Sequence, residues 1–278
     1  MLGIVIVSYR SDDRTVRFVR EEISRIGIPN RVVVVDNGAT EAEAAALAAR
    51  LEGRAEVIAA ENGGYAQGNN LGARRLMEGG DVDAILFTNN DIHLVSDDAV
   101  SILYACLRAH PEAGVVGPEI VGTDGGRQSP EPYLGLWDRY VWMYLCTPFV
   151  SRAWKRKRFG LDYAEHAQEG PHYKLMGSFL LVDACSFLEA GSFDEGTFLY
   201  AEEPILSERL SRIGKVCWFC PSVRVIHEHG AVIGRRYDAS ERSRMQMDSM
   251  LYYYEKYRHR ARWETACVRF LHRLIRKV

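Results

Sequence analysis

Short apolar runs alternate with amphipathic segments through the first third of the sequence, and this alternation limits the folds open to the chain. The runs cover residues 4–7, 32–35, 57–60 and 84–88. Each run is short and is bounded by polar residues or glycine, as buried strands are. The segment after the first run places Val16, Val19 and Ile23 at helical spacing. Strands that alternate with helices predict an α/β fold with a mostly parallel sheet and helices on both faces.

The pattern changes after about residue 120. A loop rich in glycine, proline and serine covers residues 122–132, and the segment that follows it to residue 159 is rich in aromatic side chains and ends in a basic run. Strand and helix patterns then return, and the last part of the sequence is predicted to be helical. We therefore expect one α/β domain over residues 1–235 and a helical, basic extension over residues 236–278.

Charge and cysteine content exclude several classes of protein. The formal net charge is −2, which gives no reason to expect a nucleic-acid partner. Six cysteines without a disulfide framework are typical of a reducing compartment, and the N-terminus has no signal-like segment, so we expect a cytoplasmic position. Cys217 and Cys220 have C-x-x-C spacing, but no second Cys or His pair follows at zinc-finger spacing, so we do not expect zinc there.

Polar residues follow two of the predicted strands. Asp36 and Asp91 each end an apolar run, and parallel strands bring such ends to one edge of the sheet, where α/β proteins bind ligands. A simple turn is the alternative, because Asn and Asp also close loops through their own backbone. The first strand is followed by SYRSDD, which lacks the G-x-G-x-x-G spacing of dinucleotide-binding domains, and no P-loop occurs.

Seven short motifs stand in a fixed order along roughly residues 3–230. They are IVIVSYR, VVVVDNGA, ENGGYAQGNN, LFTNND, GSFLLV, GSFDEGTFLYAEEPILSERL and VRVIHEHG. Their order and approximate spacing resemble those of family 2 glycosyltransferases, most of all the bacterial rhamnosyltransferase-type members that build surface polysaccharides. The resemblance implies a GT-A fold, a dTDP-, UDP- or GDP-sugar donor, a Mg²⁺ or Mn²⁺ ion, and inversion at the anomeric carbon.

The resemblance also assigns roles around the nucleotide. It implies that Ser8 and Tyr9 lie beside the base and that Asp36 contacts the base or the ribose. The other nucleotide-binding residues that it implies are Asn62, Gly63, Gly64, Asn69 and Asn90.

The NND sequence occupies the position of the family's D-x-D motif, so Asp91 is the expected metal-contacting carboxylate. Asn89 stands where the family has its first Asp, and its amide oxygen can ligate Mg²⁺ or Mn²⁺ without bringing charge. His227 stands where family members often have a histidine near the diphosphate or the metal, and a purely structural histidine is the alternative.

The segment YAEEPILSERL matches a family segment that usually reads E-D-x-D-L. Glu203 is the expected general base and Glu202 the second candidate, whereas the family's second Asp is Ile205 here. Pro204 suits a first helical turn, and a helix N-terminus favours the ionised form that a base needs. The alternative is that both glutamates are only favourable first-turn charges.

The C-terminal extension places apolar side chains along one helical stripe. The stripe consists of Trp263, Cys267, Phe270, Leu271, Leu274 and Val278. Residues 255–278 also hold eight Lys/Arg against two Glu, so the helix could lie on an anionic membrane surface or pack on its own domain. Acceptors in the surface-glycan pathways of this family are commonly lipid-linked, which favours a polyprenyl-linked acceptor and a peripheral position on the inner face of the cell membrane.

We therefore expect an inverting, metal-dependent enzyme that moves a hexose or deoxyhexose from a nucleotide sugar to a hydroxyl of a glycan. Two other classes stay open. A sugar-nucleotide nucleotidyltransferase should have a glycine-rich, basic loop after its first strand, and SYRSDD has no glycine. A non-catalytic nucleotide-sugar-binding protein would bind the donor without turnover, and it is favoured by Asn89 and Ile205, which stand where the family has carboxylates.

Overall fold

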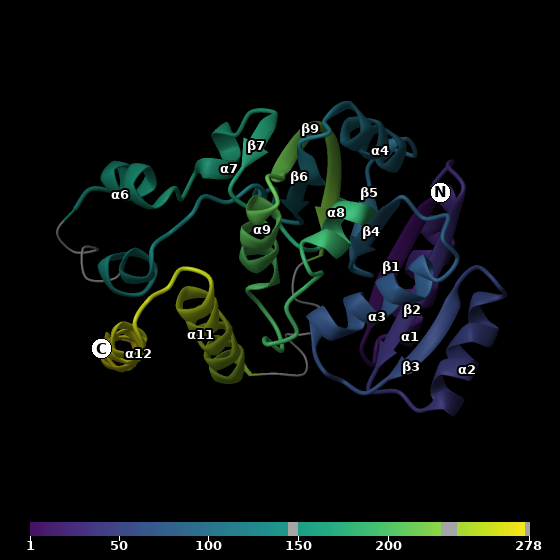
Figure 1. Cartoon of the computed structure of the whole chain (residues 1–278), viewed down its shortest axis with the longest axis horizontal. Helices are drawn as coiled ribbons and strands as arrows, with labels where there is room; N and C mark the ends of the chain where they lie inside the picture. The colour runs from purple at the N-terminus through teal and green to yellow at the C-terminus, as the bar shows by residue number, and fades with distance from the viewer. Residues whose placement is uncertain (144–149, 229–237, 276–278) are drawn as a thin grey trace.

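The computed structural model describes residues 1–143, 150–228 and 238–275, and nine strands in these ranges form one mixed sheet (Figure 1). The order along the sheet is β3-β2-β1-β4-β8-β6-β9-β5, and β7 also pairs with β9. The strands are β1 (Leu2–Ser8), β2 (Asn30–Asn37), β3 (Glu56–Ala60), β4 (Ala84–Thr88), β5 (Ile92–Leu94), β6 (Ala113–Gly122), β7 (Gly170–His172), β8 (Phe179–Asp183) and β9 (Val216–His227).

Helices connect most of these strands. The helices of the sheet region are α1 (Asp12–Glu21), η1 (Ile23–Arg25), α2 (Glu41–Leu51), α3 (Tyr65–Met77), α4 (Ala99–Ala109), α8 (Ala184–Glu189) and α9 (Glu202–Arg212). The others are η2 (Asp138–Trp142), α6 (Arg152–Phe159), α7 (Tyr163–His166), α11 (Ala239–Lys256) and α12 (Arg262–Ile275). None of the helices in the described ranges is both long and apolar enough to cross a bilayer.

The strand pairing brings the polar strand ends together. β1 pairs in parallel with β2 and β4, and Ser8 lies opposite Asp36 at the shared edge. β8 runs antiparallel to β4, so Ser178 and the residues before it meet the end of β4. β5 runs antiparallel to β9 and pairs Ile92 with His227. This last pairing connects the segment after β4 with the end of β9.

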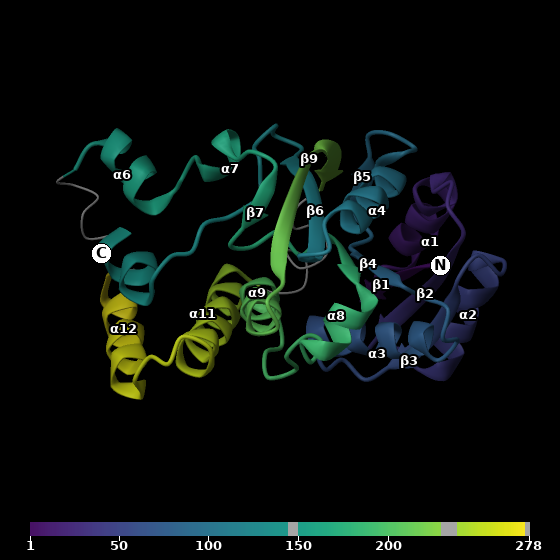
Figure 2. The same ribbon diagram turned by 45° about the horizontal axis from the view of Figure 1, so that its top comes forward.

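Helices cover both faces of the sheet, with α1 and α4 on one face and α3 on the other (Figure 2), and each face carries its own apolar core. Along β1, Ile4 and Ile6 face the side covered by α1 and α4, whereas Val5 faces α3. This alternation follows from the strand period of two, and both sets are buried because helices cover both faces. The expected α/β architecture is confirmed, with β8, β5 and β7 as its antiparallel strands.

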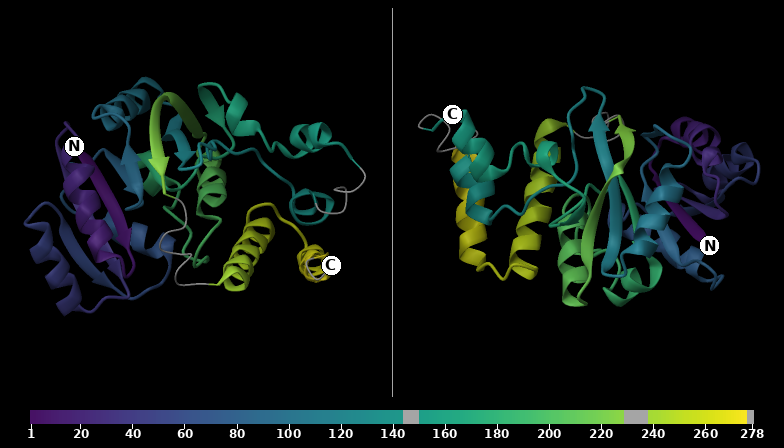
Figure 3. Two further views of the ribbon diagram at one scale, coloured as in Figure 1. Left: turned by 180° about the vertical axis from the view of Figure 1, so that it is seen from behind. Right: turned by 90° about the horizontal axis from the view of Figure 1, so that it is seen from above.

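The C-terminal helices form a third core with the sheet domain (Figure 3). Met250 and Tyr254 of α11 pack with Ile205 of α9 and Tyr140 of η2, and Val268 of α12 is fully buried in the same cluster. The helical character of the extension agrees with the sequence prediction. The boundary at residues 235 and 236 lies outside the described residues, so the two-part division stays a prediction.

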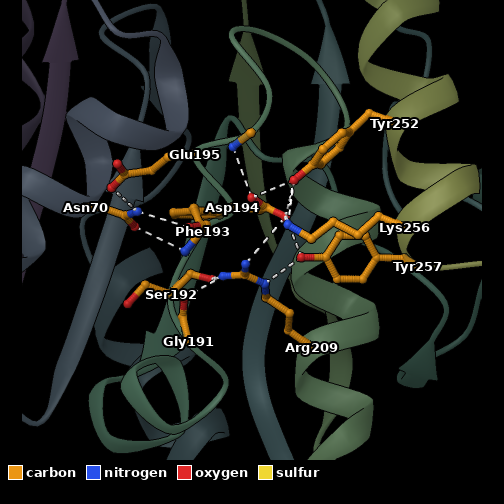
Figure 4. Close-up of polar contacts among 11 residues, drawn as sticks. Asn70, Gly191, Ser192, Phe193, Asp194, Glu195, Arg209, Tyr252, Lys256 and Tyr257 are labelled. Atoms are coloured by element: carbon orange, nitrogen blue, oxygen red, sulfur yellow. Dashed lines mark hydrogen bonds and ion pairs between the residues drawn. The ribbon is translucent and has the colours of Figure 1, made fainter.

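A charged network centred on Asp194 fastens α11 to the loop before α9 (Figure 4). The Asp194 carboxylate is buried and accepts hydrogen bonds from Tyr257 and Lys256, the latter at 2.9 Å. Arg209 of α9 lies 3.4 Å from the same carboxylate, and Tyr252 donates to it at 3.1 Å. Burial alone would raise the pKa of Asp194, but the bonds from Tyr257 and Lys256 lower it to about 2. Removal of Lys256 and Tyr257 would therefore leave a buried carboxylate short of partners.

Candidate active site

A cavity of about 430 Å³ opens where the ends of β1 and β4 meet α9 and α11. It brings together residues from the start, middle and end of the chain. The residues predicted from sequence that line it are Tyr9, Asn62, Gly64, Asn89, Asn90, Asp91, Glu202, Glu203 and His227. The nucleotide, metal and general-base predictions thus converge on one cavity, although their roles rest on the sequence resemblance.

Four predicted residues support the cavity without lining it. The buried Ser8 hydroxyl accepts a hydrogen bond from Thr15 at 3.0 Å. The Asn69 side chain donates to the backbone oxygen of Tyr65 at 3.0 Å, within its own helix. Asp36 is buried at the edge of β2, and burial, followed by the charges of Asp12 and Glu43, raises its pKa to about 6.

The glycines of the ENGGYAQG segment allow its backbone to lie close to neighbouring parts of the chain. Gly64 has φ +99°, and a Cβ placed on it would lie 2.2 Å from the backbone oxygen of Phe198. Any other residue would combine a left-handed backbone with a clash, so glycine is required there. A Cβ on the fourth supporting residue, Gly63, would instead meet the flexible side chain of Gln67.

Asp91 and His227 form the part of the cavity best suited to a cation. Asp91 Oδ1 lies 3.3 Å from His227 Nε2 and is buried without a hydrogen-bond partner in the described part of the chain. The other ring nitrogen, His227 Nδ1, lies 2.9 Å from Gln128 Oε1. An imidazole that donates through Nδ1 directs the lone pair of Nε2 toward the carboxylate, and the two groups together offer a nitrogen and an oxygen ligand of the kinds that divalent cations bind.

Tyr65 connects the predicted metal side of the cavity to the base side. Its hydroxyl lies 3.1 Å from Asn89 Oδ1 and 3.1 Å from the backbone oxygen of Gly177. Burial and the charge of Glu202 raise the pKa of Tyr65, so the hydroxyl stays protonated and can donate. The Asn90 amide donates hydrogen bonds to the hydroxyls of Ser11 at 2.9 Å and Thr15 at 2.8 Å.

The two glutamates begin α9 directly after a strained piece of backbone. Tyr200 and Ala201 have φ values of +72° and +69°, which cost of order 1–3 kcal/mol each and are commonly found at functional sites. Glu203 Oε1 accepts a hydrogen bond from Gly177 N at 3.1 Å. Glu202 is buried, its Oε1 has no hydrogen-bond partner among the described residues, and burial together with the charge of Glu203 raises its pKa to about 8.

Stability should depend on pH through Glu202. Because its pKa rises from the ordinary 4.5 to about 8 on folding, the native state keeps a proton that the unfolded chain releases in that window. Stability contributed by protonated Glu202 is therefore lost as pH rises through the window. In metal-free buffer, the melting temperature of Glu202→Gln should therefore decrease less than that of the parent as pH rises to about 8. For Asp36→Asn, the smaller decrease should be seen only up to about pH 6. Parallel melting curves for the parent and Glu202→Gln would contradict the assignment.

Three cationic side chains line the same cavity and were not anticipated from the sequence. Arg139 comes from η2, Lys174 from the segment between β7 and β8, and Arg242 from α11. Lys174 is paired with Glu131 at 2.9 Å. These residues lie outside the seven motifs. The sequence of their segments predicts only aromatic-rich or helical structure and no binding site, so it contains no local signal that could have identified them.

The relatives found by sequence comparison are glycosyltransferases. No protein-family model matches the chain. The N-acetylglucosaminyl-diphospho-decaprenol L-rhamnosyltransferase of Mycobacterium tuberculosis is 28% identical, over 84% of this chain and 78% of that protein. The low-salt glycan biosynthesis hexosyltransferase Agl10 of Haloferax volcanii is 25% identical, over 81% of this chain and 66% of that protein.

Solved structures show the same fold at low sequence identity. The mannosyltransferase PcManGT from Pyrobaculum calidifontis, in complex with GDP-Man and Mn²⁺, gives a TM-score of 0.60 at 16% identity and covers 94% of this chain and 65% of that one. GalNAc-T7 with UDP, GalNAc and Mn²⁺ gives a TM-score of 0.58 at 14% identity and covers 93% of this chain and 49% of that one. At this identity the likeness concerns the fold alone.

Proposed function

Because the chain is a glycosyltransferase of the family 2, rhamnosyltransferase-like type with a GT-A fold, we propose that it transfers rhamnose or another hexose from a nucleotide sugar to a lipid-linked glycan. The observation that carries the proposal is the meeting of Asp91, His227 and Glu203 in one cavity. The M. tuberculosis relative is named for a diphospho-decaprenol acceptor, which supports the acceptor class. The product would be an extended lipid-linked intermediate of a surface polysaccharide.

In this proposal Asp91, Asn89 and His227 hold Mg²⁺ or Mn²⁺. The buried Asp91 Oδ1 beside His227 Nε2 is the observation that fits an ion, and oxygen and imidazole ligands suit both metals. A bound ion would supply positive charge to the diphosphate of the departing nucleotide. The PcManGT and GalNAc-T7 structures are complexes that include Mn²⁺, which supports the choice of metal.

Glu203 acts as the general base in this proposal. It takes the proton from the acceptor hydroxyl as that oxygen attacks the anomeric carbon, which inverts the configuration there. Its hydrogen bond from Gly177 N holds the carboxylate in place in the cavity. Glu202, whose pKa is raised by burial, keeps its proton at neutral pH and so adds no second negative charge beside it.

A screen of nucleotide sugars tests the proposal. A dTDP-, UDP- or GDP-sugar should raise the melting temperature only when Mn²⁺ or Mg²⁺ is present, because an ion held by Asp91, Asn89 and His227 would supply the positive charge that the diphosphate needs. Transfer to a diphospho-lipid glycan should then be followed with the sugar that stabilises most. Stabilisation without turnover on any such acceptor would favour a non-catalytic binding protein.

The cationic side chains Arg139, Lys174 and Arg242 are proposed to bind the diphosphate of the acceptor. Guanidinium and ammonium groups bind phosphate oxygens through charge-assisted hydrogen bonds. Arg242 and Arg139 come from α11 and η2, which border the cavity on the side away from β1. The donor diphosphate would instead lie by Asp91, so the two anionic groups would have separate partners.

Arg242→Ala should raise the KM for a diphospho-lipid acceptor by roughly tenfold, the effect expected on losing one charge-assisted hydrogen bond. The KM for the donor should stay unchanged. Arg244→Ala is a matched control, since Arg244 is an exposed arginine of the same helix that does not line the cavity. An equal effect of Arg242→Ala on donor and acceptor KM would contradict the assignment.

We propose that one end of the molecule, where aromatic side chains are exposed, faces a membrane. Trp263 and Phe270 of α12 are 69% and 62% exposed, while Val268 on the opposite side of the helix is buried. Trp142 of η2 and Trp154 of the basic helix α6 are also exposed, and η2, α6 and α12 gather at one end of the molecule (Figures 1 and 2). Exposed Trp residues beside basic ones favour an anionic lipid interface. Arg276, Lys277 and Val278, which also entered the sequence prediction, lie outside the described residues.

Substitution of both Trp263 and Phe270 by Ser should reduce binding to anionic vesicles, and added salt should release the parent protein. Sedimentation with phosphatidylglycerol vesicles measures both effects. Leu188→Ser is the matched control, because Leu188 is an exposed apolar residue of α8, outside this end. Point substitutions are preferable to deletion of residues 256–278, which would also remove Lys256 and Tyr257 from Asp194. Unchanged vesicle binding by the double variant would contradict the proposed face.

A further inference from the structure

A second group of metal-ligating side chains lies outside the candidate active site. Cys106 and His110 of α4 and Glu169 before β7 place a sulfur, a ring nitrogen and a carboxylate oxygen within 4.8 Å of one another. Cys220 of β9 lies outside this group but is a hydrogen-bond partner of Cys106. None of the four residues lines the active-site cavity. Two separate segments of the chain therefore bring three potential ligands together, and a third segment places a second cysteine beside them.

The two cysteines of the C-x-x-C pair, Cys217 and Cys220, do not both belong to this group. In a strand, residues three apart point to opposite faces. Cys217 accordingly packs on the α9 side, with its sulfur 3.2 Å from the Ser207 hydroxyl, while Cys220 packs on the α4 side. The spacing that matters is Cys106 to His110, four residues apart in a helix and so on the same face. The expectation that zinc does not bind the C-x-x-C pair is thus compatible with a different site that uses Cys220.

The surroundings of His110 hold its ring in a fixed orientation. The ring stacks on Trp218 with centroids 3.7 Å apart and an interplanar angle of 22°. Its Nδ1 lies 3.3 Å from Glu112 Oε1. A carboxylate on one ring nitrogen fixes the tautomer and makes the other nitrogen a better ligand, which is the usual second-shell arrangement of metal-bound histidines.

Both thiols are free to bind a metal. Neither Cys106 nor Cys220 is in a disulfide. A metal binds the thiolate form of a cysteine, so cation binding at this point would release protons from the thiols.

We propose that Cys106, His110 and Glu169 bind a thiophilic divalent cation of the Zn²⁺ type, and that Cys220, the hydrogen-bond partner of Cys106, supplies a fourth ligand. These donor types are the ones that zinc takes in four-coordinate sites. The cation would connect α4 and β9 to the segment that leads from α7 into β7. Its role would be to fasten the segment carrying the basic helix α6 to the sheet, and it is independent of the proposed glycosyl transfer.

Titration of the reduced protein with Co²⁺ tests the site, because cobalt bound to thiolate gives an ultraviolet charge-transfer band that oxygen and nitrogen ligands do not give. The band should appear at one cobalt per chain, and Zn²⁺ should remove it. Cys106→Ser and Cys220→Ser should abolish it, and Glu169→Gln, an exposed change that leaves the core intact, should weaken cobalt binding by about tenfold.

Two controls separate this site from the rest of the chain. Cys185→Ser changes an exposed cysteine outside the cluster and should keep the band. Asp91→Ala should also keep it, so a failure of the active-site proposal cannot be mistaken for a failure here. Absence of the band in the parent protein, its persistence in Cys106→Ser, or recovery of a Cys106–Cys220 disulfide in place of metal binding would each overturn the proposal.

Discussion

Asp91→Ala is expected to abolish metal-dependent binding of the nucleotide sugar. Asp91 supplies the only carboxylate of the proposed Asn89, Asp91 and His227 ligand set, so its removal leaves the ion no charged protein ligand. We expect the donor affinity in the presence of Mn²⁺ to fall by about 100-fold or more, the upper range for disruption of a metal site. Isothermal titration calorimetry with the stabilising nucleotide sugar and Mn²⁺ measures the change.

Two further variants serve as comparisons for Asp91→Ala. Asn89→Ala should weaken binding less than Asp91→Ala, because the amide brings no charge and its oxygen already accepts from Tyr65. Asp98→Ala removes a nearby carboxylate that does not line the cavity and should leave donor affinity unchanged. If Asp91→Ala bound donor and Mn²⁺ as tightly as the parent, the ion would have to lie elsewhere.

The first half of the fold was predictable because its strands are local and uninterrupted. The apolar runs at residues 4–7, 32–35, 57–60 and 84–88 correspond to β1 to β4. The later strands were harder to predict. The apolar runs at residues 216–219 and 223–226 belong to one strand, β9, which continues through Pro221, where the pairing with β6 shifts register. The shift lets the chain pass a residue that cannot donate to the sheet. β6 itself was not identified from the sequence.

The candidate site was only partly predictable, for a similar reason. Motifs identified Asp91 and His227 separately, but their 3.3 Å approach depends on the pairing of β5 with β9, which no spacing in the sequence encodes. The cationic side chains Arg139 and Arg242 reach the cavity only because η2 and α11 share a core. Packing on the domain and contact with a membrane do not exclude each other for the C-terminal helix, because α12 buries Val268 and exposes Trp263. An amphipathic pattern alone cannot say which apolar residues face the protein.

Glu203→Gln is expected to reduce turnover by about 100-fold or more, the usual scale for the loss of a positioned base, with little change in donor affinity. The substitution is conservative, since the amide oxygen of Gln can still accept the bond from Gly177 N, so the cavity should keep its shape while losing the group that takes the proton. Glu202→Gln is the matched control. Because the raised pKa of Glu202 keeps it protonated at neutral pH, its amide should preserve most of the turnover. Initial rates and calorimetric donor affinities of both variants test this assignment. If Glu202→Gln lost most of its turnover while the turnover of Glu203→Gln stayed within a few fold of the parent, Glu202 would be the base.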